Sequence, residues 1–139
     1  MNDHPNNVAD SPVLRFLATH PATETIEVVL SDLNGVYRGK WLPAEAVGKI
    51  LEGKFKMPLT SVTADVWGRD VDPICEQTGD GDGICTAVEE SIRPLPWLAR
   101  PAAQLFLQLN TENGQPCGYD PRVLLGRVVQ RFHDQGLVP

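Results

Sequence analysis

The segment 25–41 constrains the fold of this chain more than any other part of the sequence. Its two ends are runs of β-branched and aromatic residues, and Asp32-Leu33-Asn34-Gly35 lies between them. Residues of these types favour strands, and Asn-Gly between two such runs is a strong local signal for a β-hairpin. The segment therefore predicts two antiparallel strands joined by a type I′ turn, with Asn34 and Gly35 at its central positions.

Helices and further strands are predicted after this hairpin. Pro43, followed by apolar residues at helical spacing, predicts a short helix that ends near Gly53. Asp120 as N-cap predicts a longer helix that ends at Gly136. This pattern predicts an α+β fold in which one helix packs on a β-grasp-like mixed sheet. The other predicted elements are strands at 61–67, 84–88 and 104–110, a loop at 68–83 and a turn at Asn113-Gly114.

Length and composition indicate one main globular core. The chain has 139 residues, of which 42% are hydrophobic and 22% are charged. Residues 1–12 are polar and contain Pro5 and Pro12, so they bury too little apolar surface to offset the entropy of ordering. We expect a disordered tail there.

Charge and targeting signals exclude several classes of function. The formal net charge of −6 repels a phosphate backbone, so no nucleic-acid partner is expected. No signal peptide and no run of apolar residues long enough to span a membrane occurs, so no membrane partner is expected either. Cys75, Cys85 and Cys117 match neither a metal knuckle nor a dense disulfide framework, which favours the cytoplasm.

The acidic region between Asp65 and Glu90 is the one place where a cation site must be weighed. An EF-hand alignment that starts at Thr78 puts Asp80, Asp82 and Glu89 at ligand positions 3, 5 and 12. Thr replaces the usual first Asp, and no amphipathic helices flank the loop. A calcium site and a solvated acidic loop are therefore the two interpretations. The rest of the chain has no paired histidines, nucleophile motif or phosphate-binding loop.

The second strand of the hairpin carries two cations. Arg38 and Lys40 are two residues apart and should lie on the same face of that strand, near Asp32. Two interpretations stay open: a charged edge that keeps the sheet soluble, or part of an interface.

With its surroundings, this string resembles the N-terminal domain of the glutamine synthetase family. The resemblance covers residues 13–139, and the order and spacing of its motifs carry it. Those motifs are Phe16-Leu17, His20-Pro21, Asp32-Leu33-Asn34-Gly35, Arg38-Gly39-Lys40, Leu42-Pro43, Pro96-Trp97, Ala103-Gln104, Asp120-Pro121-Arg122, Leu124-Leu125 and Gly136-Leu137.

The resemblance implies an ATP-dependent ligase in which the γ-carboxylate of glutamate is phosphorylated and then attacked by ammonia or an amine. ATP and Mg²⁺ or Mn²⁺ would bind to a catalytic domain beyond this chain, so the 139-residue fragment is predicted to be inactive and to bind no cofactor. Residues 13–117 would form the β-grasp domain. Residues 118–139 would form the first helix of the truncated catalytic domain.

In the family this domain completes the active site of a neighbouring subunit in a ring of six, commonly stacked as twelve. The resemblance makes Asp65 the candidate acidic residue of the ammonium or amine subsite. Arg38, Lys40 and Trp67 are candidate substrate or interface residues. The segment 57–68 departs from the glutamine-forming pattern and resembles the γ-glutamylpolyamine synthetase branch, which implies a cationic amine as acceptor.

Two alternatives to this function stay open. One is a stand-alone ubiquitin-like module that binds proteins, and the other is the calcium-binding domain discussed above. For Asp65 itself, a carboxylate that faces solvent at the end of a strand is the alternative to a site residue.

Overall fold

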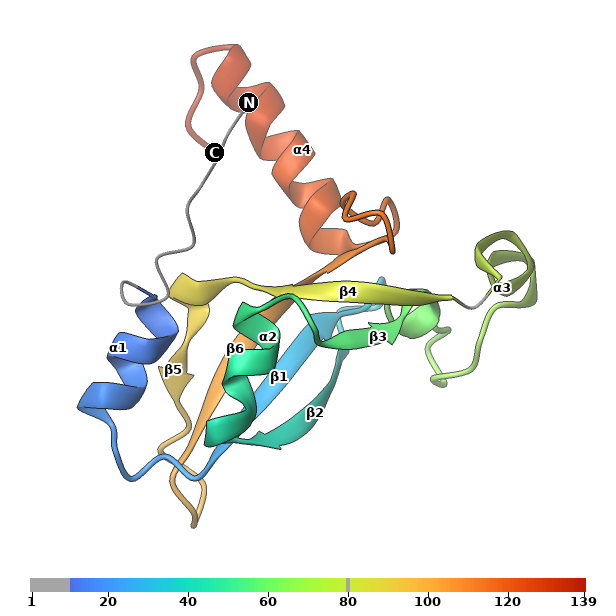
Figure 1. The fold of residues 1–139 in the computed structure, drawn as a ribbon. Helices are drawn as coiled ribbons and strands as arrows, with labels where there is room; N and C mark the ends of the chain where they lie inside the picture. The colour runs from blue at the N-terminus through green and yellow to red at the C-terminus, as the bar shows by residue number, and fades with distance from the viewer. Residues whose placement is uncertain (1–10, 80) are drawn as a thin grey trace.

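The computed structural model of the chain describes residues 11–79 and 81–139 and has a mixed α+β architecture (Figure 1). Most of the predicted tail lies outside the described residues, but its last residue, Pro12, already begins a helix. The elements are α1 (Pro12–Thr19), β1 (Thr25–Ser31), β2 (Tyr37–Pro43), η2 (Ala44–Val47), α2 (Gly48–Leu51), β3 (Lys56–Pro58), η3 (Leu59–Val62), α3 (Asp72–Thr78), β4 (Asp82–Ala87), η4 (Glu89–Ser91), β5 (Arg93–Pro94), β6 (Ala102–Asn110) and α4 (Pro121–Asp134).

The strands form one mixed sheet in the order β2-β1-β6-β4-β3, and β5 also pairs with β6. β1 runs parallel to β6, and every other pair is antiparallel. The register sets Val28 opposite Lys40 of β2 on one side and opposite Leu105 of β6 on the other. The predicted α+β class and mixed sheet are confirmed.

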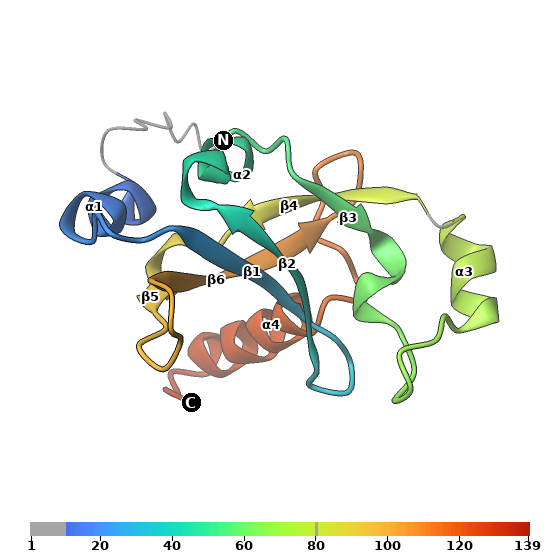
Figure 2. The same ribbon diagram turned by 90° about the horizontal axis from the view of Figure 1, so that it is seen from below.

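The core lies on one face of this sheet because apolar residues alternate along the two central strands. Figure 2 shows α2 over this face and α4 on the opposite side of the sheet. Burial of each such side chain stabilises the fold by about 1.5–3 kcal/mol. The strand and helix residues of this cluster include Ile26, Val28, Leu30, Ile50, Leu105, Leu107 and Leu109.

The hairpin is confirmed, but its turn differs from the predicted one. A five-residue connection joins β1 to β2. The N–H of Gly35 donates to the carbonyl of Asp32 (3.0 Å), which centres the turn on Leu33 and Asn34. In the predicted turn, with Asn34 and Gly35 at its centre, the N–H of Val36 would donate to the carbonyl of Leu33. It donates to the Asp32 carboxylate (2.8 Å). The side chain of Asp32 therefore sets the turn type, and Gly35 follows the turn with φ +77°.

The predicted strand at 61–67 is wrong. The segment forms the end of η3 and then turns, and the strand in this region is β3, which precedes it. Both the N–H and the hydroxyl of Thr63 donate to the carbonyl of Thr60 (3.0 and 3.2 Å). Such local hydrogen bonds compete with strand pairing for β-branched polar residues.

Two helices occur where the sequence predicted none. α3 lies inside the predicted loop at 68–83, and Pro73 is in its first turn. α1 is capped by Ser11, whose hydroxyl accepts from the N–H of Leu14 (3.4 Å). Both helices are short, and each has a proline in its first turn, where proline is favoured.

The predicted C-terminal helix is confirmed as α4. One carboxylate oxygen of Asp120 accepts from the N–H of Arg122 (2.8 Å), and the other accepts from the N–H of Leu109 in β6 (2.7 Å). Beyond its first turn the helix projects away from the sheet (Figure 1), and most of its apolar residues are exposed, with Leu125 at 62%. Short helical turns also confirm the predicted helix after Pro43, as η2 and α2.

Candidate functional site

An open cleft of about 560 Å³ lies between β2 and the segment that leads from β3 to α3. β2 contributes Tyr37 and Arg38 to its lining. The opposite side includes Thr60, Gly68 and Asp70. Figure 2 shows the β1–β2 turn and the loop before α3 at the same end of the sheet. We call this space the β2 cleft and residues 63–70 the 63–70 loop.

Arg38 is held in place by a carboxylate. Its Nε and Nη2 atoms both lie 2.9 Å from Oδ2 of Asp32. The guanidinium also lies against Gly68, because a Cβ added to that residue would be 3.0 Å from Nη1 of Arg38. Arg38 therefore connects the hairpin to the 63–70 loop.

Lys40 lies on the same side of β2 as Arg38, as the alternation predicted. Lys40 contacts a different residue, because its Nζ lies 5.9 Å from the centre of the Phe55 ring. Such a cation–π contact at an exposed site is worth about 0.5–1 kcal/mol. Arg38 thus contacts the loop that carries Asp65 and lines the β2 cleft, whereas Lys40 does not line it.

Asp65 organises the 63–70 loop. Its Oδ1 accepts from the N–H groups of Trp67 and Arg69, both at 2.8 Å. Its own N–H donates to the carbonyl of Arg69 (2.8 Å), and its carbonyl accepts from the N–H of Gly68 (2.9 Å). Asp65 is only partly buried and does not sit at the end of a strand. The local hydrogen bonds fix where this carboxylate stands, one residue after Ala64, which lines the β2 cleft; Asp65 and Trp67 themselves are not among its lining residues.

Trp67 is 80% exposed on the same loop, and its neighbour Val66 is 67% exposed. Large aromatic residues are enriched at protein interfaces, where one side chain can bury a large apolar area. The loop therefore presents a carboxylate and an indole on a framework fixed by hydrogen bonds.

Asp32 is a buried carboxylate beside Arg38, and its contacts were not expected from the sequence. It is 1% exposed. Burial alone would raise the pKa of its carboxyl, but hydrogen bonds from Val36, Arg38 and Asn34 outweigh that effect and lower the pKa. The signal was present in the sequence, because an Asp two residues before Asn-Gly commonly bonds to the turn backbone.

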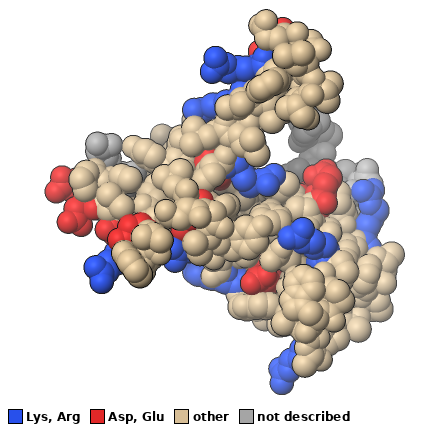
Figure 3. All heavy atoms as spheres, turned by 180° about the vertical axis from the view of Figure 1, so that it is seen from behind, with Lys and Arg blue, Asp and Glu red and all other residues tan. Residues whose placement is uncertain are grey.

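Acidic side chains gather at the end of the molecule that carries α3 (Figure 3). Asp70, Asp72 and Glu76 are all exposed, and Asp70 also lines the β2 cleft. Arg69 is also exposed. The local excess of negative charge attracts cations.

The calcium alignment is not supported by the described part of the chain. Asp80 lies outside the described residues, and positions 5 to 10 of the aligned loop form the extended strand β4. Glu89 stands beyond the far end of that strand and accepts a hydrogen bond from the hydroxyl of Ser11. A loop that wraps a cation must curl, and a strand does not.

The described residues, 11–79 and 81–139, lack two further features. They contain no cluster of three or more His, Cys, Asp or Glu side chains that could hold a metal ion. None of their helices has the length and apolarity needed to cross a membrane. Burial and the nearby charge of Asp120 raise the pKa of the Cys85 thiol to about 12, so it is not a nucleophile at neutral pH.

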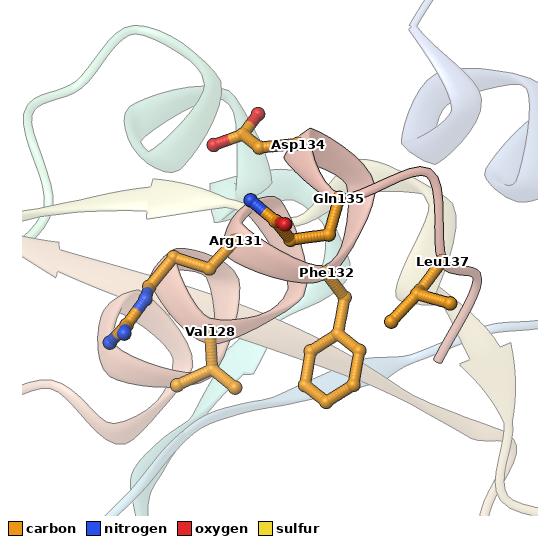
Figure 4. Close-up of a pocket in the computed structure, with 6 residues that line it drawn as sticks. All are labelled: Val128, Arg131, Phe132, Asp134, Gln135 and Leu137. Carbon is orange, nitrogen blue, oxygen red and sulfur yellow. The ribbon is translucent and has the colours of Figure 1, made fainter.

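A second hollow, of about 400 Å³, lies at the C-terminal end of α4. Figure 4 shows Val128 and Phe132 on the helix, with Leu137 of the following segment turned toward the same space. This lining is mainly apolar, and the charged groups Arg131 and Asp134 stand at its edge.

Comparison with known proteins identifies relatives of this chain, although no family model matches it. The chain is 31% identical to the gamma-glutamylputrescine synthetase PuuA of Escherichia coli (strain K12) over 129 residues, which are 91% of this chain and 27% of that protein. Its fold matches the ADP complex of GmaS with a TM-score of 0.68 and 25% identity, over 88% of this chain and 26% of that one.

A third match supports the fold alone. A glutamine synthase homologue has a TM-score of 0.69 and 21% identity, over 81% of this chain and 27% of that one. The chain thus spans about a quarter of the length of the proteins that it matches. The sequence identity and the shared mixed sheet together place the chain in the glutamine synthetase family, to whose N-terminal region it corresponds.

Proposed function

We propose that this chain is the N-terminal part of an ATP-dependent ligase that joins an amine, in preference to ammonia, to the γ-carboxylate of glutamate. The observation that carries the proposal is the 31% identity to a gamma-glutamylputrescine synthetase over nearly the whole chain. The match to a GmaS structure with bound ADP supports the use of a nucleotide. A protein-binding module of the ubiquitin type has no comparable support.

The 63–70 loop and the β2 cleft are the part of this chain that would serve the reaction. In the proposal they complete the active site of a neighbouring subunit in a homo-oligomer, a ring of six or a stack of twelve. The exposed indole of Trp67 supports an interface at this loop, since burial of a side chain of this size contributes much of the energy of association. Asp65 stands beside it, with one oxygen engaged by the loop backbone.

Charge supports a cationic acceptor. Residues 65–76 carry four acidic groups, Asp65 and the exposed Asp70, Asp72 and Glu76, and one basic group, Arg69. A protonated amine approaching this end of the molecule is attracted, and the attraction weakens as salt screens it. An acceptor with two or more charged amino groups gains more from this field than ammonium does.

The described residues do not fit the binding of ATP or of the metal ion. They contain no cluster of metal ligands, and the sequence has no glycine-rich phosphate loop. In the proposal both ATP and Mg²⁺ or Mn²⁺ bind to the catalytic domain. The 139-residue chain alone then binds glutamate and the amine incompletely and does not catalyse ligation.

Phosphate release by the full-length protein tests this proposal. The assay contains glutamate, ATP and Mg²⁺ or Mn²⁺, with ammonium, a monoamine, a diamine or a longer polyamine as acceptor. We expect release to depend on the acceptor and to be fastest with a diamine or polyamine. Equal rates of phosphate release with and without an acceptor would contradict the ligase proposal. Faster release with ammonium than with any amine would contradict the proposal that the acceptor is an amine. The isolated 139-residue chain should release no phosphate.

A further inference from the structure

Asp32 makes two separate sets of contacts, one with each carboxylate oxygen. Oδ1 accepts from the N–H groups of Asn34 and Val36, both at 2.8 Å. Oδ2 lies 2.9 Å from both Nε and Nη2 of Arg38. The first set shapes the hairpin turn, and an asparagine could provide it. The second set is an ion pair and needs the negative charge, so the charge of Asp32 acts to hold the guanidinium of Arg38.

The guanidinium of Arg38 reaches the backbone of the 63–70 loop. A Cβ on Gly68 would lie 3.0 Å from Nη1 and 3.6 Å from Nη2. Gly68 also has φ +80°, a conformation that residues with a Cβ adopt at a cost. The absence of a side chain at this position thus allows the charged group to pack directly against the loop.

Two more contacts join the same turn to the other end of that segment. The Nδ2 of Asn34 donates to the carbonyl of Ala64 (2.8 Å). The N–H of Leu33 donates to the carbonyl of Val62 (3.0 Å). The hairpin turn therefore holds the segment on both sides of Asp65.

We propose that Asp32 and Arg38 act together as positioning residues that fix the 63–70 loop, and with it Asp65, for the amine acceptor. This inference rests on the proposed function. Asp32 is 1% exposed, so it cannot touch a substrate and acts only through Arg38 and the turn. Its carboxyl is ionised at neutral pH, and the hydrogen bonds from Val36, Arg38 and Asn34, which lower its pKa, favour that charged form further.

The variant Asp32→Asn separates the two sets of contacts. Its amide oxygen can still accept from the turn backbone, while its NH₂ group cannot accept from Arg38. Arg38→Gln breaks the same pair from the partly exposed side, which protects the test against a misfolded Asp32 variant. Arg38→Lys restores the charge and should recover part of the effect. Lys54→Met is the matched control, because it removes an exposed ion pair with Glu52 (2.7 Å).

The experiment measures amide hydrogen exchange by mass spectrometry and steady-state kinetics on the full-length protein. In Asp32→Asn and Arg38→Gln we expect peptides that cover residues 63–70 to exchange at least tenfold faster, while peptides of β6 stay unchanged. The KM for a diamine should rise at least tenfold, with the KM for ATP and kcat within twofold. Lys54→Met should change none of these quantities.

Three results would overturn the inference. Unchanged exchange in residues 63–70 would show that the pair does not hold the loop. An equal rise in β1 and β6 would show a general loss of stability. Faster loop exchange with an unchanged KM for the diamine would show that the loop does not position the acceptor. If no acceptor supports phosphate release at all, the proposed function fails. Hydrogen exchange in residues 63–70 then decides by itself whether Asp32 and Arg38 hold the loop.

Discussion

Replacing Gly35 tests the structure of the hairpin turn. Gly35 has φ +77°, and no heavy atom lies within 4 Å of the position that a Cβ would take. Gly35→Ala therefore introduces no clash, and its cost is the backbone strain alone. That strain is about 1–2 kcal/mol for an L-residue in the left-handed region. Gly35→Val should cost more, because a β-branched side chain resists this conformation further.

Urea unfolding of the 139-residue chain, followed by circular dichroism, measures this cost. We expect the midpoint to fall in the order glycine, alanine, valine, with an unchanged dependence of the free energy on urea concentration. Gly35→Asn should lie between glycine and alanine, since Asn tolerates positive φ. Gly48→Ala is the control: Gly48 is helical, with φ −52° and open space at its Cβ, so alanine should stabilise the chain by up to about 1 kcal/mol. Equal stability of the Gly35 variants and the native chain would refute the left-handed conformation of Gly35.

Three further predictions follow from single side chains. Asp65→Asn in the full-length protein should raise the KM for a diamine about tenfold or more, because it removes negative charge beside the acceptor. Glu112→Gln, which removes an exposed carboxylate elsewhere, should leave this KM unchanged, and equal steady-state constants for Asp65→Asn and the native protein would exclude Asp65 from the site. Folding lowers the pKa of Asp32, so the stability that its charge contributes is complete above the ordinary pKa of 3.8 and is lost as the pH falls through the lower folded value. The free energy of unfolding in urea should therefore change less between pH 7 and pH 3 in Asp32→Asn than in the native chain, and an equal change in both would contradict this. Cys85, buried and with a pKa near 12, should resist maleimide at pH 7.5 until urea unfolds the chain; rapid labelling of the folded chain, read by mass spectrometry, would disprove its burial.

Elements with strong local signals could be predicted from the sequence. The hairpin follows from two strand-forming runs around Asn34-Gly35, and α4 follows from Asp120, Pro121 and a long apolar period. The segment 61–67 misled the prediction because β-branched residues also suit turns stabilised by their own hydroxyls, as at Thr63. The start of α3 carried a proline signal, but its surroundings are rich in Gly and Asp, which favour loops.

The candidate site could be predicted only in part. Arg38 and Lys40 were expected on one face, because strand alternation is a local rule. The contact between Arg38 and Gly68 joins residues thirty positions apart, and no periodicity in either segment indicates it. The same is true of Asn34 and Ala64. Whether Asp65 serves the amine acceptor is a question for the kinetic test.

The carboxylate of Asp120 joins the last helix to the sheet. One of its oxygens accepts from the final strand and the other from the first turn of the helix, so this side chain helps to set the angle between the two, together with Arg122, whose guanidinium lies 5.8 Å from the centre of the Phe106 ring. The orientation of any domain that packs on the exposed face of that helix is therefore fixed relative to the sheet. Loss of this carboxylate would remove both hydrogen bonds, and the orientation of the helix would then depend on the remaining contacts of its first turn, such as that of Arg122 with Phe106.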